Sequence, residues 1–395
     1  MITKRLFDDD PYMKEFTSEI VSSERNDNKI LLVLKETAFF PEEGGQEPDN
    51  GEIEGFPVID VQISDDIITH VIDDPDNNII SLQAGNKVFC RINWAKRFSN
   101  MQNHTGEHIL SGILHRDYSS ENVGFHLSSH IVTLDTSKNL TQDELDELEI
   151  KANKAVYANI EVRAAYYSPE EAQKREYRSK KEIKGDIRIV DIEGVDSCAC
   201  CAPHVTRTGE IGLVKIVKAI KYKGGSRLTI LCGERAFLYV QKMQVYLNEL
   251  SQITSESMDN ITKAVETYKN EIAALKYKAV SAEKQELMKE IEELPANSSG
   301  IVLFKDGLDK FNQREGVNRL VEISNGCSAI FNGNENKGFY YIIGTSKGDA
   351  RELNKVLSER FNARGGGSKE MVQGSVSATE IEITNVINEY NSSYL

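Results

Sequence analysis

The amino-acid sequence predicts an α+β protein built from several domains. Its 395 residues are enough for two or three domains, each with its own buried core. Short apolar runs dominate the first 92 positions, residues 236–294 contain neither glycine nor proline, and strand-like and helix-like segments alternate after that point. These three patterns predict a small N-terminal β-barrel, a mixed α+β domain, a long helical arm with coiled-coil character and a small C-terminal α/β domain.

The first domain is expected to span residues 1–92. Three apolar or alternating runs, separated by turn-forming residues, have the composition of strands: 30–34, 58–63 and 87–92. That rhythm is typical of a small barrel or sandwich. An intervening loop contains Gly44, Gly45 and Gln46, where paired glycines allow a sharp turn or the close approach of a ligand. A plain hairpin turn is the alternative interpretation.

The second domain is expected to span residues 93–235, and a helix that carries His104 and His108 opens it. A second helix is predicted at 141–157, because Thr-Gln-Asp-Glu is the signature of an N-terminal capping box. A basic stretch lies at 174–188. The predicted strands are 131–134, 160–163, 187–190, 211–216 and 224–230.

Residues 236–296 are expected to form the helical arm. Apolar side chains recur there at helical spacing, as at Val240, Met243, Leu247 and Leu250. A long helix or helical hairpin with such a stripe needs a partner helix. The arm therefore either packs within the chain or mediates dimerisation.

Residues 297–395 are expected to form the last domain, in which strands and helices alternate. The predicted strands are 300–304 and 338–344, and the predicted helices are near 315–324 and 350–361. A flexible, basic loop is expected at 364–369. Its amide groups at Gly365, Gly366 and Gly367 could hold a phosphate or an RNA backbone.

The composition indicates a soluble protein of a reducing compartment. Six cysteines are too few and too unevenly spaced for a disulfide framework in so long a chain. The N-terminal segment is charged, and no apolar run reaches the length needed to cross a bilayer. We therefore expect a cytoplasmic protein with no membrane partner. The net charge of -15 argues against non-specific binding to a polyanion, so local patches must hold any nucleic acid.

Two pairs of metal-ligating side chains have the same spacing. His104 and His108 lie four residues apart on the predicted helix, so their imidazoles project from one face. Cys200 and His204 form a second pair in the densest cysteine cluster of the chain. Three imidazoles and one thiolate make a tetrahedral set suited to Zn2+. Cys198 and Cys201 are the alternative thiolate ligands, and a merely buried or oxidised cysteine trio would need no metal.

Two further side chains near the first pair are candidates for chemistry. His104 to His108 matches the H-x-x-E-H motif of inverted zinc peptidases, in which Glu107 would be the general base. That scheme requires an acidic downstream ligand in place of Cys200 and His204. His126 follows the predicted metal helix after a short segment and could line the same pocket.

Together these motifs resemble the editing domain of alanyl-tRNA synthetases and the stand-alone alanyl-tRNA editing proteins of the AlaX type, in their long form. The likeness is carried by four segments: Met101–Ser111, Cys200–Val205 with Thr208–Gly212, Gly44–Gln46, and Gly365–Gly367 with Met371–Gly374. The last of these resembles the C-terminal domain of alanyl-tRNA synthetases.

The resemblance implies ATP-independent hydrolysis of tRNA(Ala) mischarged with serine or glycine, in support of translational fidelity, without aminoacylation. It implies zinc held by His104, His108, Cys200 and His204 in an editing domain at 93–235. It also implies an amino-acid pocket bordered by Gly44, Gly45 and Gln46, with Gln46, Glu107 and His126 as candidate catalytic residues. The expected RNA contacts are the basic stretch at 174–188, Arg227 and the loop at 364–369 with Gly365, Gly366 and Gly367. A homodimer through the arm or the C-terminal domain is also expected. A zinc-stabilised tRNA-binding protein without catalysis is the non-enzymatic alternative.

Overall fold

The structure is a computed structural model that describes residues 2–76, 79–179 and 185–393. It confirms the α+β class, with helices and sheets in both halves of the chain. The chain divides into two compact units, one ending at Leu247 and the other beginning at Asn248. The predicted division into four domains at 92, 235 and 296 stays a prediction. No helix in the described ranges is long and apolar enough to cross a bilayer.

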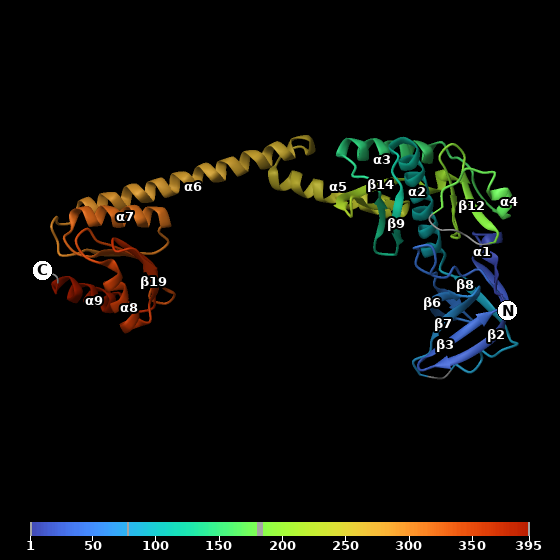
Figure 1. Cartoon of the computed structure of the whole chain (residues 1–395), viewed down its shortest axis with the longest axis horizontal. Coiled ribbons are helices and arrows are strands. Elements are labelled where there is room, and N and C mark those ends of the chain that lie inside the picture. The colour runs from blue at the N-terminus through green and yellow to red at the C-terminus, as the bar shows by residue number, and fades with distance from the viewer. Residues whose placement is uncertain (1, 77–78, 180–184, 394–395) are drawn as a thin grey trace. The chain divides into compact units, whose positions relative to one another are not determined.

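Six strands close into a barrel in the first unit, in the order β2-β3-β7-β6-β5-β8, drawn in blue in Figure 1. Buried and exposed residues alternate along β8, so one face of each strand reaches the barrel core. The elements of this region are β1 (Lys4–Arg5), α1 (Leu6–Asp9), β2 (Glu15–Asn26), β3 (Lys29–Leu34), β4 (Glu36–Thr37), β5 (Gly51–Ile53), β6 (Phe56–Ser64), β7 (Ile67–Asp73) and β8 (Lys87–Ile92).

Helix α2 (Trp94–Tyr118) lies at the centre of the rest of this unit. It contacts strands of one sheet, in the order β14-β15-β10-β9, and β13 of a second sheet, in the order β11-β12-β13. The other elements are β9 (Asn122–Leu127), β10 (Val132–Thr136), α3 (Gln142–Tyr157), β11 (Val162–Tyr167), α4 (Pro169–Ala172), β12 (Ile187–Ile192), β13 (Asp196–Ala199), η1 (Thr208–Ile211), β14 (Val214–Tyr222) and β15 (Gly225–Cys232).

Every residue of α2 from Asn100 to Leu114 is buried. The helix begins at an Asn93 cap and is fixed to β15 by Asn103, whose amide oxygen accepts a hydrogen bond from the Cys232 N–H at 2.9 Å. A buried ion pair between Arg97 and Asp49 joins the helix to the barrel. The first turns of α2 are therefore held by both the sheet and the barrel.

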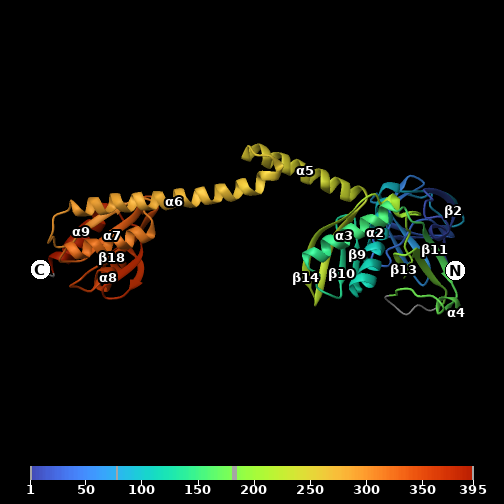
Figure 2. The same cartoon turned by 90° about the horizontal axis from the view of Figure 1, so that it is seen from above.

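The second unit is a three-layer sandwich around one five-stranded sheet, in the order β16-β17-β18-β20-β19. Helices α6 and α7 share an apolar core with one face of the sheet, and α8 and α9 share another core with the opposite face. Figure 1 shows α6 and α7 on one side of the strands and α8 and α9 on the other, and Figure 2 shows the same elements from above. The elements are α6 (Ile261–Glu292), β16 (Val302–Lys305), α7 (Lys310–Ile323), β17 (Ser328–Asn334), β18 (Gly338–Gly344), α8 (Ala350–Phe361), β19 (Arg364–Gly367), β20 (Met371–Val376) and α9 (Glu380–Ser392).

The predicted helical arm consists of two helices, α5 (Glu234–Thr254) and α6, separated by a short segment that contains η2 (Met258–Asn260). The expected flexible loop at 364–369 is wrong for its first four residues, because they form the edge strand β19, paired with β20. A side chain at Gly365 would meet the Tyr341 hydroxyl at 2.4 Å. That glycine is therefore required for packing in the sheet.

Candidate metal centre

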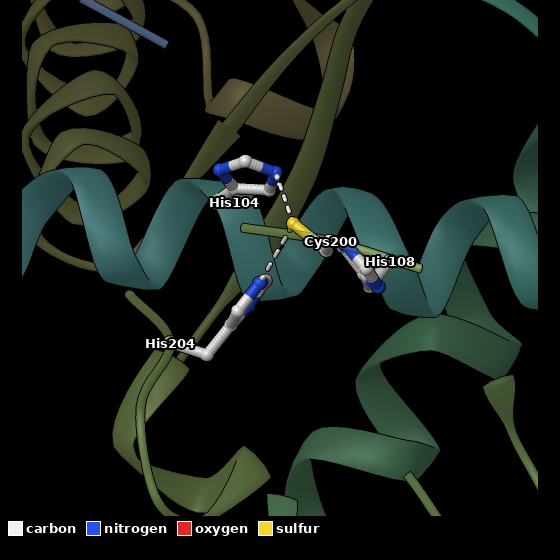
Figure 3. A group of neighbouring side chains, drawn as sticks. All are labelled: His104, His108, Cys200 and His204. Atoms are coloured by element: carbon white, nitrogen blue, oxygen red, sulfur yellow. Dashed lines mark hydrogen bonds between the residues drawn. The ribbon is translucent and has the colours of Figure 1, made fainter. Parts of the chain in front are cut away.

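The structure brings the two predicted ligand pairs together. One ligand atom from each of His104, His108, Cys200 and His204 lies within 4.8 Å of the others, as Figure 3 shows. The Cys200 Sγ atom is 3.6 Å from Nε2 of His104 and 3.4 Å from Nε2 of His204. Zn–N and Zn–S bonds of usual length at a tetrahedral angle separate N and S by about 3.5 Å. These two separations therefore match those of one zinc-sized ion bound by Cys200, His104 and His204.

Each of the three imidazoles is anchored through its Nδ1 atom by a different partner. Nδ1 of His104 lies 2.8 Å from the Gln46 amide oxygen, and Nδ1 of His108 lies 3.0 Å from the Asp196 carboxylate. Nδ1 of His204 lies 3.0 Å from Oγ1 of Thr105, whose hydroxyl donates to the Met101 carbonyl and so accepts from the imidazole. With Nδ1 protonated in this way, Nε2 of each ring presents a lone pair for a metal.

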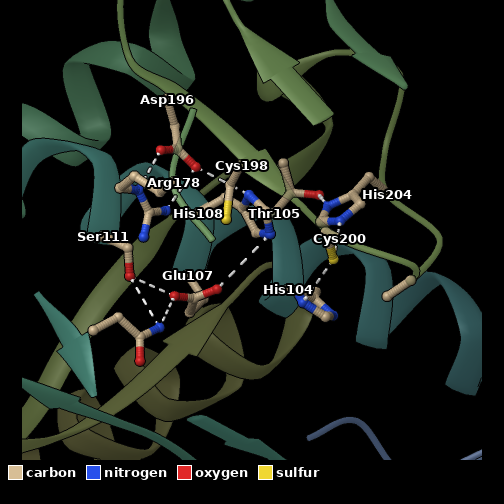
Figure 4. A network of polar contacts seen from close by, with 12 residues as sticks. His104, Thr105, Glu107, His108, Ser111, Arg178, Asp196, Cys198, Cys200 and His204 are labelled. Atoms are coloured by element: carbon tan, nitrogen blue, oxygen red, sulfur yellow. Dashed lines mark hydrogen bonds and ion pairs between the residues drawn. The ribbon is translucent and has the colours of Figure 1, made fainter. Parts of the chain in front are cut away.

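A second layer of charge supports His108. Arg178 donates to both carboxylate oxygens of Asp196, at 2.7 and 2.8 Å, and Asp196 in turn accepts from His108. Figure 4 shows this chain of contacts. Burial alone would raise the pKa of Asp196, but His108 and Arg178 lower it overall. The carboxylate therefore stays ionised and holds the His108 ring in one orientation.

The electrostatics of the cluster favour a thiolate at Cys200. Burial would raise the pKa of this thiol, yet the nearby imidazoles of His104 and His204 lower it well below its ordinary value. Burial would lower the pKa of His108, but its hydrogen bond to Asp196 and the adjacent Cys200 raise it well above the ordinary value. Burial lowers the pKa of His204 to about 3. The thiolate is the form of Cys200 that a borderline-soft divalent ion binds.

The two competing cysteines do not complete the group of three histidines. Cys201 packs against the barrel core, and burial together with the charge of Cys200 and of Glu43 raises its pKa. Cys198 is buried on β13 next to His108 and Asp196, with which it forms a second metal-capable group. Among the described residues, only Cys200 completes a group that contains both helix histidines.

The glycine-containing loop lies against β9 and delivers Gln46 to the cluster. Gly44 and Gly45 have φ of +65° and +85°, and the Gly45 carbonyl accepts from the Leu127 N–H at 2.7 Å. A side chain at Gly45 would lie 2.5 Å from the Phe125 carbonyl oxygen. Gln46 is fully buried, and its Nε2 has no hydrogen-bond partner in the described part of the chain. The Gln46 Nε2 group, next to His104, is therefore available to donate a hydrogen bond to a ligand.

Glu107 is buried beside the four ligand side chains. One carboxylate oxygen accepts from the Ser111 hydroxyl and from the Asn122 amide. The other oxygen lies 4.0 Å from Nε2 of His108. This carboxylate is therefore oriented toward the position that a metal ion would occupy.

The remaining predicted site residues are not brought to this cluster. His126 is exposed on β9, and strand alternation points it away from the face on which Phe125 lies 4.9 Å from the His104 ring. Arg227 forms a two-pronged ion pair with Asp135, at 2.6 and 2.7 Å. Gly365, Gly366 and Gly367 belong to the second unit.

The basic stretch at 174–188 has an unexpected role at its end. Arg188 is buried, and its guanidinium donates to the carbonyls of Cys200 and Ala202 at 2.9 Å each. It therefore shapes the turn that presents Cys200. Lys180, Lys181 and Lys184, which carry much of the predicted charge, lie outside the described residues.

Sequence reasoning missed Thr105, Arg178 and Asp196. A signal for Asp196 exists in the strand period of two, because Asp196 and Cys198 share the buried face of β13 just before Cys200. No comparable spacing singles out Arg178, because its role depends on a contact between segments.

Known proteins match this chain along its length. A family model described as "Threonyl and Alanyl tRNA synthetase second additional domain" matches residues 187–229, which include Cys200 and His204, and one described as "tRNA synthetases class II (A)" matches residues 11–96. The alanine–tRNA ligase of Ignicoccus hospitalis is 33% identical over 308 residues, which are 73% of this chain and 32% of the ligase. This chain thus spans about a third of the length of that relative.

Two similar proteins have nearly the same extent as this chain. Alanyl-tRNA editing protein AlaX-L of Pyrococcus horikoshii is 26% identical over 415 aligned positions that cover all of both chains. Alanyl-tRNA editing protein Aarsd1 of Danio rerio is 26% identical over 93% of each chain. By its full-length match to AlaX-L and its matches to two synthetase family models, the chain resembles the alanyl-tRNA editing proteins of the long AlaX type.

Proposed function

We propose that this protein is an aminoacyl-tRNA deacylase that acts in trans on tRNA(Ala) mischarged with serine or glycine. The observation that carries the proposal is the convergence of His104, His108, Cys200 and His204 within 4.8 Å. Relatives of the same length, named as alanyl-tRNA editing proteins, support the substrate class.

The proposed cofactor is Zn2+, held by these four side chains. Support comes from the nitrogen and sulfur donors, the pre-anchored Nδ1 atoms and the separations of 3.4 and 3.6 Å. When bound, the ion would polarise the ester carbonyl or lower the pKa of a water molecule.

The side chains around the metal ligands supply the rest of the proposed mechanism. Glu107 is proposed as the general base, because Ser111 and Asn122 fix one of its oxygens and the other lies 4.0 Å from the His108 ring. It would accept a proton from the water that attacks the amino-acid carbonyl carbon. It would return this proton to the ribose oxygen as the ester bond breaks, which gives the free amino acid and a terminal ribose hydroxyl. The Gln46 Nε2 is the proposed donor to the aminoacyl group, because it is buried without a partner among the described residues.

The proposed partners are the tRNA and a second copy of this chain. A second copy is supported by apolar side chains on α6 that are half-exposed or more, at Val265, Ile272 and Leu275. Their spacing of seven and three residues is that of a coiled-coil seam. Specificity for serine over alanine would come from a group that hydrogen-bonds the serine hydroxyl, because alanine would leave that group unpaired.

The peptidase alternative is less well supported. An H-x-x-E-H peptidase needs an acidic third ligand, whereas Cys200 and His204 complete the group that contains both helix histidines.

The test is release of serine from Ser-tRNA(Ala), with Ala-tRNA(Ala) as the control substrate and with and without a chelator. We expect serine to be released preferentially and the chelator to abolish the reaction. Cys200→Ser should lose bound metal and activity, whereas the adjacent Cys201→Ser should keep both, because Cys200 faces the imidazoles and Cys201 packs against the barrel core. No release by the metal-loaded protein, or equal release from both substrates, would refute the proposal.

A further inference from the structure

A cavity of about 1100 Å³ opens beside the metal cluster, within the first unit. It lies between the C-terminal turns of α2, the start of β9, the segment 175–179 and the turn that enters β13. Its volume lies just above the roughly 300–1,000 Å³ typical of ligand sites. The cavity can therefore hold a ligand larger than a single amino acid.

The floor of this cavity consists of groups that support the metal ligands. Asp196, Cys198 and Asn122 all line it. Asp196 holds His108 at 3.0 Å, and Asn122 donates to the carboxylate of Glu107. The cavity thus ends one side chain away from both the proposed metal and the proposed base.

The described lining is balanced in charge, unlike the chain as a whole. Three arginines and three carboxylates contribute to it: Arg116, Arg175, Arg178, Glu121, Glu176 and Asp196. The net charge of the whole chain is -15. The positive and negative side chains of the described lining are equal in number, so the cavity should repel an RNA chain less than the rest of this acidic protein does.

The walls offer an aromatic ring and two accessible guanidinium groups. Tyr177 lines the cavity and packs only partly against a small apolar core. The side chains of Arg116 and Arg175 are 50% and 38% exposed. Arg175 donates to Asp191 through one terminal nitrogen, whereas Arg116 donates to Asp117 and to the Gly194 carbonyl. Each guanidinium has five N–H donors, so both keep donors for a further acceptor. Aromatic faces and exposed arginines are the groups that bind unpaired bases and their phosphates.

We infer that this cavity binds the single-stranded 3′-terminal nucleotides of the RNA, with Tyr177 stacking on a base and Arg175 and Arg116 contacting the phosphates. The inference rests on the proposed function, since the ester to be cleaved is carried by the terminal ribose. A nucleotide bound here would lie next to the proposed metal site, because Asp196 lines the cavity and holds His108.

The test is direct binding of a CCA ribonucleotide trimer to the metal-loaded, full-length protein by titration calorimetry. Tyr177→Leu should weaken binding roughly tenfold, because one stacking contact is lost while the apolar packing is kept. Tyr177→Phe should bind as the unmodified protein does. Tyr157→Leu is the matched control, since Tyr157 is 73% exposed at the end of α3 and does not line the cavity.

The phosphate contact has its own pair of variants. Arg175→Ala should weaken trimer binding and make it less dependent on salt, while leaving the binding of adenosine nearly unchanged. Arg163→Ala is the control, because Arg163 is paired with Glu161 on the exposed strand β11, away from the cavity lining. Metal content, measured for every variant, excludes a general loss of structure.

The outcomes separate this inference from the proposed function. If the protein releases serine but the trimer fails to bind, or binds equally to Tyr177→Leu, the inference is wrong and the deacylase proposal stands. If the trimer binds in a manner that depends on Tyr177 and no serine is released, the cavity is a single-stranded RNA site and the deacylase proposal fails.

Discussion

At the scale of residues, the three histidines are oriented by three chemically different partners. An amide holds His104, a carboxylate holds His108 and a hydroxyl holds His204. Only Asp196 brings a negative charge, so it alone makes its imidazole a stronger electron donor as well as fixing the ring. His108 should therefore depend on its partner more than the other two ligands do.

Removing the charge of Asp196 tests this role. Asp196→Asn should lower zinc affinity by about 10- to 100-fold, as loss of a ligand-orienting carboxylate does in other metal sites. Competition with a chromophoric chelator measures the affinity. Asp135→Asn is the matched control, because Asp135 forms the equivalent two-pronged pair with Arg227. Equal zinc affinity in the two variants would contradict the role assigned to Asp196.

At the scale of elements, the turn at Gly44 and Gly45 connects the barrel to the metal cluster. Its backbone pairs with β9 through the hydrogen bond from Leu127, and this pairing places Gln46 against His104. The two glycines therefore matter for close packing of the loop as much as for any contact with a ligand.

Alanine at two glycines separates close packing from backbone strain. Gly45→Ala should lower both zinc affinity and the free energy of unfolding, because the new side chain would lie 2.5 Å from a backbone carbonyl. Gly55→Ala has a similar φ of +79° but meets no atom within 4 Å. It should cost only the roughly 1–2 kcal/mol of left-handed strain. Denaturant unfolding and chelator competition measure the two quantities, and equal effects of both variants would argue against the packing role.

Sequence patterns located several elements well. The predicted helix at 350–361 coincides with α8, and the capping box at Thr141 begins α3. Such signals are local, because capping and helical periodicity depend on residues within one or two turns. The edge strand β19 was missed because its three consecutive glycines are typical of a loop, and only its pairing with β20 makes it a strand.

At the scale of the whole molecule, the two units have separate apolar cores. The clusters around the barrel and α2 lie in the first unit, and those on both faces of the five-stranded sheet lie in the second. Both metal-capable groups found among the described residues belong to the first unit. Metal binding should therefore stabilise one unit without the other.

Calorimetry of the full-length protein tests this separation. We expect two unfolding transitions, of which one shifts to lower temperature on chelation, because a ligand stabilises only the unit that binds it. The Cys201→Ser variant should show the same shift, and Cys200→Ser should lack it. A single transition, or a chelator effect on both, would contradict the independence of the cores.

The sequence alone determined which side chains could hold a metal and most of the elements that carry them. Two histidines four residues apart on a helix must share a face, whatever the rest of the chain does. Only the tertiary structure decided that Gln46, Arg178 and Asp196 support those ligands, that His126 does not, and that a cavity opens beside them. The three supporting contacts join residues that lie 18 to 88 positions apart in the sequence. No local periodicity encodes a contact over such a separation.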